Sequence, residues 1–133
     1  MLDTNILIYL IKNRPAEVAI HMNRLAAEDT VCMSYVTYAE LLKGAQRSAS
    51  RDRVLLQLAA LTQVVPVDYQ VDDSLCTHYA RVSTQLRDAG TPIGANDLWI
   101  ASHALSLACV LVTNKEREFQ RVEGLQLQNW AAA

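Results

Sequence analysis

The sequence predicts an α/β protein in which helices cover both faces of a central parallel sheet. Two patterns support this class. Short apolar runs alternate with longer segments whose apolar residues recur every three or four positions, as strands alternating with helices do. The chain has 133 residues, of which 51% are hydrophobic, and a formal net charge of −2. This is the composition of one folded domain with a real core, so we expect residues 1–133 to form a single domain.

The amino-terminal half begins with an apolar run at 2–11, interrupted by Asp3-Thr4-Asn5. This run is too short to show where a strand ends and a helix begins. A helix is expected at 15–28, because proline suits the first turn. A short buried strand at 30–34 and helices at 35–46 and 51–62 follow from the apolar spacing.

The carboxyl-terminal half continues the alternation. Asp68 is expected to cap a long helix that ends before Gly90. Asn96 or Asp97 is expected to open the next helix. Strands are expected at 64–67, 109–113 and 125–127, and helices at 69–88, 96–107 and 115–119.

Four acidic residues stand beside apolar runs, and they are Asp3, Glu40, Asp97 and Glu118. A carboxylate at the edge of an apolar element is costly to bury alone, but several can converge on a cation. Clustered carboxylates suit Mg²⁺ or Mn²⁺, which usually act on phosphate esters. Ligands of parallel sheets bind beyond the carboxyl ends of the strands. The four acids therefore predict a metal-dependent nuclease.

Each acid also has a simpler structural explanation. Asp3 and Asp97 are well placed as helix caps. Glu40 would ordinarily face solvent, and Glu116 and Glu118 are easily explained as surface charges. The joint occurrence of acids at strand ends and helix starts is what favours a shared site.

Composition restricts the remaining functions. The three cysteines are odd in number and match no zinc spacing, which indicates reduced core thiols in a cytoplasmic protein. The three histidines share no ligand spacing, and we expect ordinary surface or core roles for them. No signal peptide is visible, and no apolar run approaches the roughly 20 residues of a membrane helix. The net charge argues against broad nucleic-acid binding, although basic stretches at 43–53 and 115–121 could hold phosphates on either side of an acidic pocket.

Four sequence blocks resemble the PIN-domain ribonucleases, and more narrowly the VapC toxins of bacterial toxin–antitoxin pairs. They are Leu2-Asp3-Thr4-Asn5-Ile6, Tyr38-Ala39-Glu40-Leu41, the stretch from Gly94 to Ala101, and the stretch from Leu111 to Phe119. They cover nearly the whole chain in the family's order, and together they are specific. The resemblance is strongest to VapC toxins that cut initiator tRNA in its anticodon stem-loop. It implies a three-layer α/β/α PIN-like domain with four to five parallel strands, dependence on Mg²⁺ or Mn²⁺, a homodimer, and inhibition by a VapB-type antitoxin.

Residue by residue, the resemblance implies that Asp3, Glu40 and Asp97 are the main catalytic acids. Asp3 and Asp97 would bind the metal, and Glu40 would do so directly or through water. Glu118, beside Phe119, is the expected fourth acid.

The chain departs from the family's pattern near the fourth acid. Many relatives have an Asp directly after Thr-Asn, where this chain has Lys115, and Glu116 is a reserve candidate. Asn5, Thr113 and Asn114 would orient the carboxylates. The sequence also begins two residues before Asp3, where relatives usually have a few more.

Three alternative hypotheses about the function remain open at this point. A phosphorelay receiver domain would use Asp68 as phosphoacceptor with Thr113 and Lys115 as switch residues, but adjacent acids after the first strand are missing. A dehalogenase-type phosphatase needs Asp-x-Asp there, and Asp3 is followed by Thr4 and Asn5. A non-catalytic RNA- or antitoxin-binding module on the same scaffold is the third.

Overall fold

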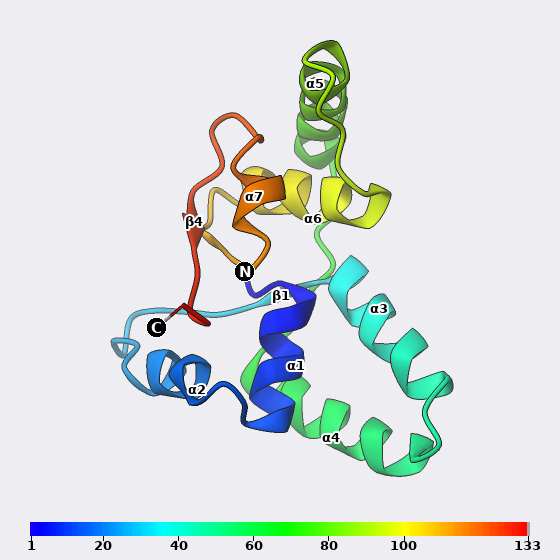
Figure 1. The fold of residues 1–133 in the computed structure, drawn as a ribbon, viewed down its shortest axis with the longest axis vertical. Helices are drawn as coiled ribbons and strands as arrows, with labels where there is room; N and C mark the ends of the chain where they lie inside the picture. The colour runs from blue at the N-terminus through cyan, green and yellow to red at the C-terminus, as the bar shows by residue number, and fades with distance from the viewer. Residues whose placement is uncertain (133) are drawn as a thin grey trace.

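The computed structural model describes residues 1–132, so the last residue of the expected 1–133 domain lies outside the described residues. Helices and short strands alternate along the described chain (Figure 1). The helices are α1 (Thr4–Lys12), α2 (Ala16–Asn23), α3 (Tyr35–Gln46), α4 (Arg51–Val64), α5 (Asp73–Asp88), α6 (Ala95–Ser106) and α7 (Glu116–Phe119). The strands are β1 (Met33–Ser34), β2 (Val67–Asp68), β3 (Leu111–Val112) and β4 (Leu127–Gln128).

All strand pairing in the described chain is parallel, as predicted. β1 pairs with β2, and β3 pairs with β4. Leu2 lies between the two pairs: it bridges to Val112 in parallel and donates its backbone N–H to the carbonyl of Cys32 at 2.8 Å. The resulting order is β2, β1, the segment around Leu2, β3 and β4. Because the regular pairing is only two residues long, it forms two small sheets rather than one continuous sheet.

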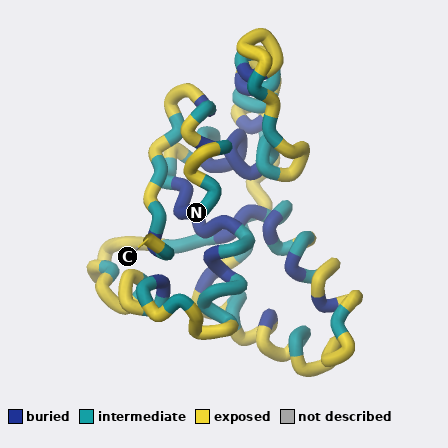
Figure 2. The backbone as a smooth tube through the Cα atoms, in the orientation of Figure 1, coloured by how far each residue is buried: buried dark blue, intermediate teal, exposed yellow. Residues whose placement is uncertain are grey.

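The parallel segments separate two apolar cores. Leu2 and Val112 belong to one core, whereas their neighbours Met1 and Leu111 belong to the other, because successive strand residues point to opposite faces. Helices α1–α4 pack on the first core and α5–α7 on the second (Figure 1). The buried backbone is concentrated between these groups (Figure 2). This is the three-layer α/β/α arrangement that the sequence predicts.

Helix boundaries agree with the sequence prediction where local signals are strong. α3 begins and ends at the predicted residues, and the Ser34 hydroxyl caps it by accepting from the N–H of Val36 at 3.2 Å. α2 ends at Asn23 rather than Glu28.

The prediction that Asp68 caps the long helix is wrong. Asp68 is part of β2, and α5 starts at Asp73 with Asp72 as its cap. The Asp72 carboxylate accepts from the N–H of Leu75 at 3.1 Å, which is the usual capping contact. Val71 therefore lies before the helix, with 58% of its surface exposed.

The cysteines are all free, but they are not all core residues. Cys32 and Cys109 are half-buried, whereas Cys76 is exposed on α5. The expectation of three core thiols is therefore wrong for Cys76.

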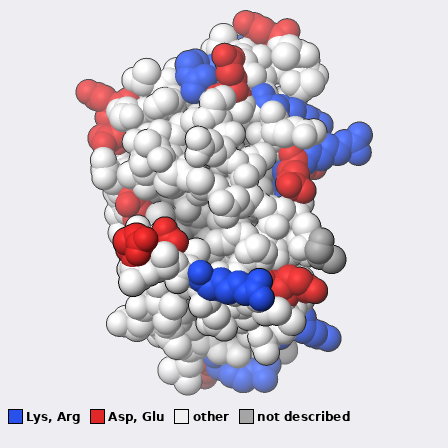
Figure 3. All heavy atoms as spheres, turned by 90° about the vertical axis from the view of Figure 1, so that its left-hand side faces the viewer, with Lys and Arg blue, Asp and Glu red and all other residues white. Residues whose placement is uncertain are grey.

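The outer surface carries few charges at the centre of one face. On the side that includes β4 and α2, the upper middle of the face is uncharged, whereas a basic side chain crosses its lower middle with acidic groups on either side (Figure 3). Within residues 1–132, no helix combines the length and the apolar character needed to cross a membrane.

Candidate active site

Asp3 caps α1 and also faces the expected site. Its backbone is extended, with φ −72° and ψ 162°, and one carboxylate oxygen accepts from the N–H of Thr4 at 2.8 Å. The other oxygen accepts from the Thr113 hydroxyl, also at 2.8 Å. Asp3 is therefore a helix cap, and its second oxygen is bonded to Thr113, which was also expected at the site.

The Asp3 carboxylate is deeply buried, with only 1% of the residue exposed. Burial raises the pKa of Asp3 above its ordinary value, although hydrogen bonds from Thr113 and Thr4 act in the opposite direction. The negative charge of Asp97 raises this pKa further. Asp3 and Asp97 therefore lie close enough for their charges to interact.

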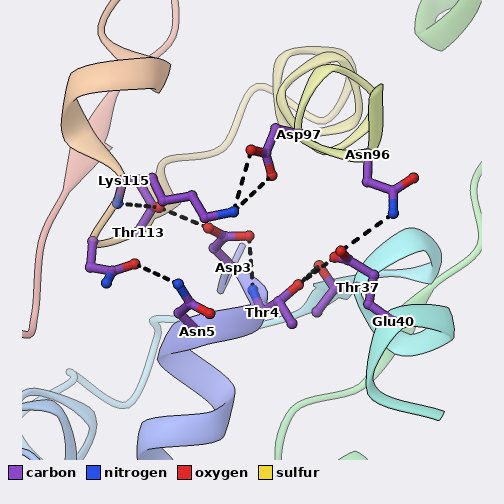
Figure 4. Close-up of polar contacts among 10 residues, drawn as sticks. Asp3, Thr4, Asn5, Thr37, Glu40, Asn96, Asp97, Thr113 and Lys115 are labelled. Carbon is purple, nitrogen blue, oxygen red and sulfur yellow. Dashed lines mark hydrogen bonds and ion pairs between the residues drawn. The ribbon is translucent and has the colours of Figure 1, made fainter. Parts of the chain in front are cut away.

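Glu40 connects three helices at the same place. One of its oxygens accepts from the Thr4 hydroxyl on α1 at 2.7 Å. Its second oxygen accepts from the side-chain amide of Asn96 on α6 at 3.3 Å. Glu40 is thus directed inward from α3, and the expectation for an isolated glutamate, that it faces solvent, does not hold here (Figure 4).

Asp97 lies in the first turn of α6 and does not cap it, because α6 begins at Ala95 with Gly94 at the cap position. Both of its carboxylate oxygens face the Lys115 ammonium, at 3.4 and 3.3 Å. Burial would lower the pKa of Lys115, but the nearby carboxylates of Asp97, Asp3 and Glu40 outweigh it, and the pKa is raised. The structure therefore brings three of the four predicted acids around one lysine (Figure 4).

Glu118 and Glu116 are placed differently from these three acids. Glu118 is half-buried on α7, and none of the hydrogen bonds or ion pairs among residues 1–132 joins it to the other acids. The Glu116 carboxylate accepts from the side-chain amide of Asn129 at 3.2 Å and so faces the carboxyl-terminal segment.

Of the residues expected to orient the carboxylates, Thr113 bonds one of them. Asn5 donates to the side-chain carbonyl of Asn114 at 3.1 Å, and Asn114 donates to the Tyr9 hydroxyl at 2.9 Å. This pair therefore ties α1 to the loop after β3, the loop that carries Lys115.

The donor set suits a hard divalent cation. It offers three carboxylates, with amide and hydroxyl oxygens around them, and oxygen ligands are what Mg²⁺ and Mn²⁺ prefer. Among residues 1–132, no three acidic, cysteine or histidine side chains already stand at metal-binding distances from one another. A lysine ammonium instead lies against Asp97. The chemistry of these residues therefore fits a divalent cation.

Sequence reasoning missed a second polar cluster, here called the His103 cluster, formed by Ser34, Asp68 and His103. The His103 ring is fully buried, with Nδ1 at 2.8 Å from the Ser34 hydroxyl and Nε2 at 3.0 Å from the Asp68 carboxylate. Ser34 and Asp68 are register partners in the β1–β2 pair. Nothing in the spacing of these residues along the chain signals their contact.

Comparison with known proteins gives a consistent match. The family model of the PIN domain matches residues 1–125. The chain is 48% identical over 130 residues to "Ribonuclease VapC1" of Haemophilus influenzae strain R2866, covering 98% of this chain and 96% of the relative. It is 39% identical over 132 residues to "tRNA(fMet)-specific endonuclease VapC" of Shigella flexneri, covering 98% and 97%.

Solved structures match equally well. VapBC-1 from nontypeable Haemophilus influenzae aligns with a TM-score of 0.92 at 47% identity, covering 99% of this chain and 98% of the other. VapBC2 from Rickettsia felis, bound to a DNA fragment from its promoter, aligns with a TM-score of 0.91 at 33% identity, covering 98% and 97%.

Proposed function

The chain belongs to the PIN-domain family and, within it, to the VapC ribonucleases, and from this premise we propose how it acts. It is an endoribonuclease toxin of a type II toxin–antitoxin pair, and it depends on Mg²⁺ or Mn²⁺. Its substrate is initiator tRNA, cut in the anticodon stem-loop, so that translation is inhibited. Family membership rules out the receiver-domain and dehalogenase readings, and Asp68, the residue that a receiver would phosphorylate, is bonded to buried His103.

One observation carries the catalytic part of the proposal. Asp3, Glu40 and Asp97 come from distant parts of the chain and are brought to one place: Lys115 contacts Asp97, Thr113 bonds both the Asp3 carboxylate and the N–H of Lys115, and Glu40 accepts from Thr4, the residue after Asp3. Three carboxylates with a single ammonium leave a net negative centre, and the deeply buried Asp3 makes such a centre costly without a cation. A divalent cation provides the missing positive charge.

The acidic residues and Thr113 have different roles at the proposed metal site. Asp3 and Asp97 would hold the cation, and Glu40 and Glu118 would contribute directly or through water, with Glu116 in reserve. A divalent cation at such a site supplies Lewis-acid stabilisation of the phosphate and a water that loses its proton more easily. Thr113 keeps the Asp3 carboxylate oriented.

Asn5 and Asn114 serve the site from further away. Their hydrogen bond fixes α1 against the loop after β3, which keeps Asp3 and Lys115 in register. By analogy with the family, water would attack the phosphorus and the 3′ oxygen would leave, so that the products carry a 5′-phosphate and a 3′-hydroxyl and no protein nucleophile is required.

The antitoxin partner has a suitable surface next to these acids. A cavity of about 500 Å³ lies between α1, α3 and α4 and includes Thr4 and Glu40 of the site. Its other walls are largely apolar, with Lys12 and Arg53 among the lining residues. We assign this cavity to an apolar segment of a VapB-type antitoxin, which would thereby lie beside the catalytic acids. The protein is further proposed to act in the cytoplasm as a homodimer of single PIN domains spanning residues 1–133.

The catalytic proposal is tested by sequencing the 5′ ends of cellular RNA after brief expression, together with cleavage of purified tRNAs in Mg²⁺, Mn²⁺ or EDTA. One dominant cut in the anticodon stem-loop of initiator tRNA, absent in EDTA, is the expected result. Metal-independent cleavage would contradict the metal site. No cleavage of any RNA by folded protein would favour a non-catalytic binding module.

The antitoxin surface is tested by hydrogen exchange with and without the antitoxin. Amides of α4 and the carboxyl-terminal part of α3 should become protected, because they line the cavity. Unchanged protection in 40–58 would place the antitoxin elsewhere.

A further inference from the structure

Lys115 is the one residue of the site whose contact the catalytic scheme does not explain. We propose that its ammonium is a resident counter-ion, which a divalent cation must displace from Asp97 when it binds. Metal binding to this protein is then an exchange of one cation for another. The inference rests on the proposed function, because it concerns the same acids.

The position of the lysine is built by the backbone around it. The N–H of Lys115 donates to the Thr113 hydroxyl at 3.0 Å, and that hydroxyl donates to Asp3. Its side chain therefore starts from a loop that is fixed to the buried acid. From there the ammonium reaches both oxygens of Asp97, at 3.4 and 3.3 Å (Figure 4).

The charges explain why the ammonium stays. Asp3, Glu40 and Asp97 together carry three negative charges, and unlike charges a few ångströms apart attract even when partly solvated. The Asp97 side chain is 15% exposed and that of Lys115 is 40% exposed. The lysine is thus held by a mostly buried partner while its own outer part remains in water.

The same charges prevent the Lys115 ammonium and a divalent ion from contacting Asp97 at the same time. A divalent ion that is coordinated by Asp97 would bring two further positive charges to the ammonium, at the distance of a contact. Like charges repel at that range, so one of them must leave. The partly exposed Lys115 side chain has open solvent beside it, and it can withdraw without disturbing either core.

This role predicts effects of opposite sign for two measurements. Removing the charge of Lys115 eliminates the competitor, so metal should bind more tightly. It also removes the only cation in contact with Asp97 among residues 1–132, so the metal-free protein should become less stable. A lysine that only braced the loop would, when removed, weaken metal binding and stability together.

The experiment is a calorimetric titration of purified full-length protein with Mn²⁺ alone, in the absence of RNA. Lys115→Met should lower the Kd for Mn²⁺ about tenfold, which equals about 1.4 kcal/mol. Lys115→Arg, which keeps the charge, should stay within about twofold of wild type. Arg24→Met is the matched control, because it removes an exposed charge at the carboxyl-terminal end of α2. Its Kd for Mn²⁺ should also stay within about twofold of wild type.

Thermal melting provides the second readout. Metal-free Lys115→Met should melt below wild type and gain more from saturating Mn²⁺. If Lys115→Met folds poorly, Lys115→Gln serves as a second neutral variant. Its Kd for Mn²⁺ should also be lower than that of wild type.

Two kinds of failure are distinguishable. An unchanged or weaker Kd in both neutral variants, while wild type binds Mn²⁺ and cleaves RNA, overturns the counter-ion and leaves the proposed function intact. If wild type and Asp97→Asn bind Mn²⁺ equally, or not at all, the metal site of the proposed function fails, and the exchange fails with it.

Discussion

The acidic site and the His103 cluster are both polar groups assembled from distant segments, yet they differ in how many carboxylates they bring together. In the His103 cluster, both ring nitrogens have partners, and Ser34 also caps α3. In the acidic site, Asp97 is the one of the three carboxylates that contacts the Lys115 ammonium, and Asp3 is buried with a raised pKa. One cluster holds a single carboxylate bonded to an imidazole, and the other holds three carboxylates and a single ammonium.

From this difference we predict that the His103 cluster serves the fold and that the acidic site serves a ligand. A satisfied network rigidifies the structure around it, and the His103 cluster joins β1, β2 and α6, the last of which carries Asp97. A network with unbalanced charge lowers stability until a ligand arrives. Substitutions in the His103 cluster should therefore mainly lower stability, and substitutions in the acidic site should mainly lower activity.

The largest expected effect is on cleavage. Asp97→Asn or Asp3→Asn should lower kcat/KM at least about 10³-fold, because a metal contributes several kcal/mol to phosphate chemistry and each 1.36 kcal/mol is a factor of ten. Single-turnover cleavage of initiator tRNA measures this. Asp88→Asn, at an exposed position on α5, is the control, and undiminished cleavage by either site variant would refute the assignment.

The second effect is on stability. His103→Ala should lower the free energy of unfolding by about 3 kcal/mol, since it leaves a cavity and two unpaired polar partners. Urea denaturation measures it, with His78→Ala, on the surface side of α5, expected within about 0.5 kcal/mol of wild type. If His103→Ala is as stable as wild type, the His103 cluster does not stabilise the fold.

Thr113→Val tests the link between orientation and activity. It keeps the shape but removes the hydroxyl that donates to Asp3. Loss of a group that orients a metal ligand typically costs 10- to 100-fold, and we expect a loss in about that range in both metal affinity and cleavage. Equal activity of Thr113→Val and wild type would show that Asp3 does not need the hydrogen bond from Thr113.

The fourth acid is tested by a pair of substitutions on α7. Glu118→Gln should reduce cleavage about tenfold, if it acts on the metal through water. Glu116→Gln should change cleavage less than about twofold, because its carboxylate is engaged with Asn129. The reverse ranking would make Glu116 the fourth acid.

The smallest expected effect concerns pH and the metal-free fold. The pKa of Asp3 is raised by burial above its ordinary value of 3.8, so the folded state binds this proton more tightly than the unfolded chain. Asp3 therefore stabilises the fold below that value, and the contribution is lost as pH rises through the raised pKa. In EDTA, the stability of Asp3→Asn relative to wild type should increase between pH 4 and pH 7. A relative stability that falls over this range, by urea denaturation, would contradict the sign.

Local sequence signals predicted part of the molecule well. The helix from Tyr35 to Gln46 is predicted at both ends, because Ser34 is a strong cap and the apolar spacing is regular. The acids Asp3, Glu40 and Asp97 were identified from their place beside apolar elements and from the family's motifs. Their convergence follows from parallel segments whose carboxyl ends share one edge.

Long-range contacts account for what the sequence did not predict. Asp68 has the local features of a cap, but its contact with His103 depends on how α6 packs against β2. Asp97 likewise looks like a cap, whereas Gly94 occupies that position. The contact of Lys115 with Asp97 joins the loop after β3 to α6. Such pairings are set by packing, on which spacing along the chain carries no information.

Crystals soaked in Mn²⁺ and measured at its absorption edge would locate the cation itself. We predict an anomalous peak coordinated by carboxylate oxygens of both Asp3 and Asp97, with the Lys115 ammonium withdrawn from Asp97. A peak away from these two residues, in crystals of protein that still cleaves RNA, would contradict the proposed site.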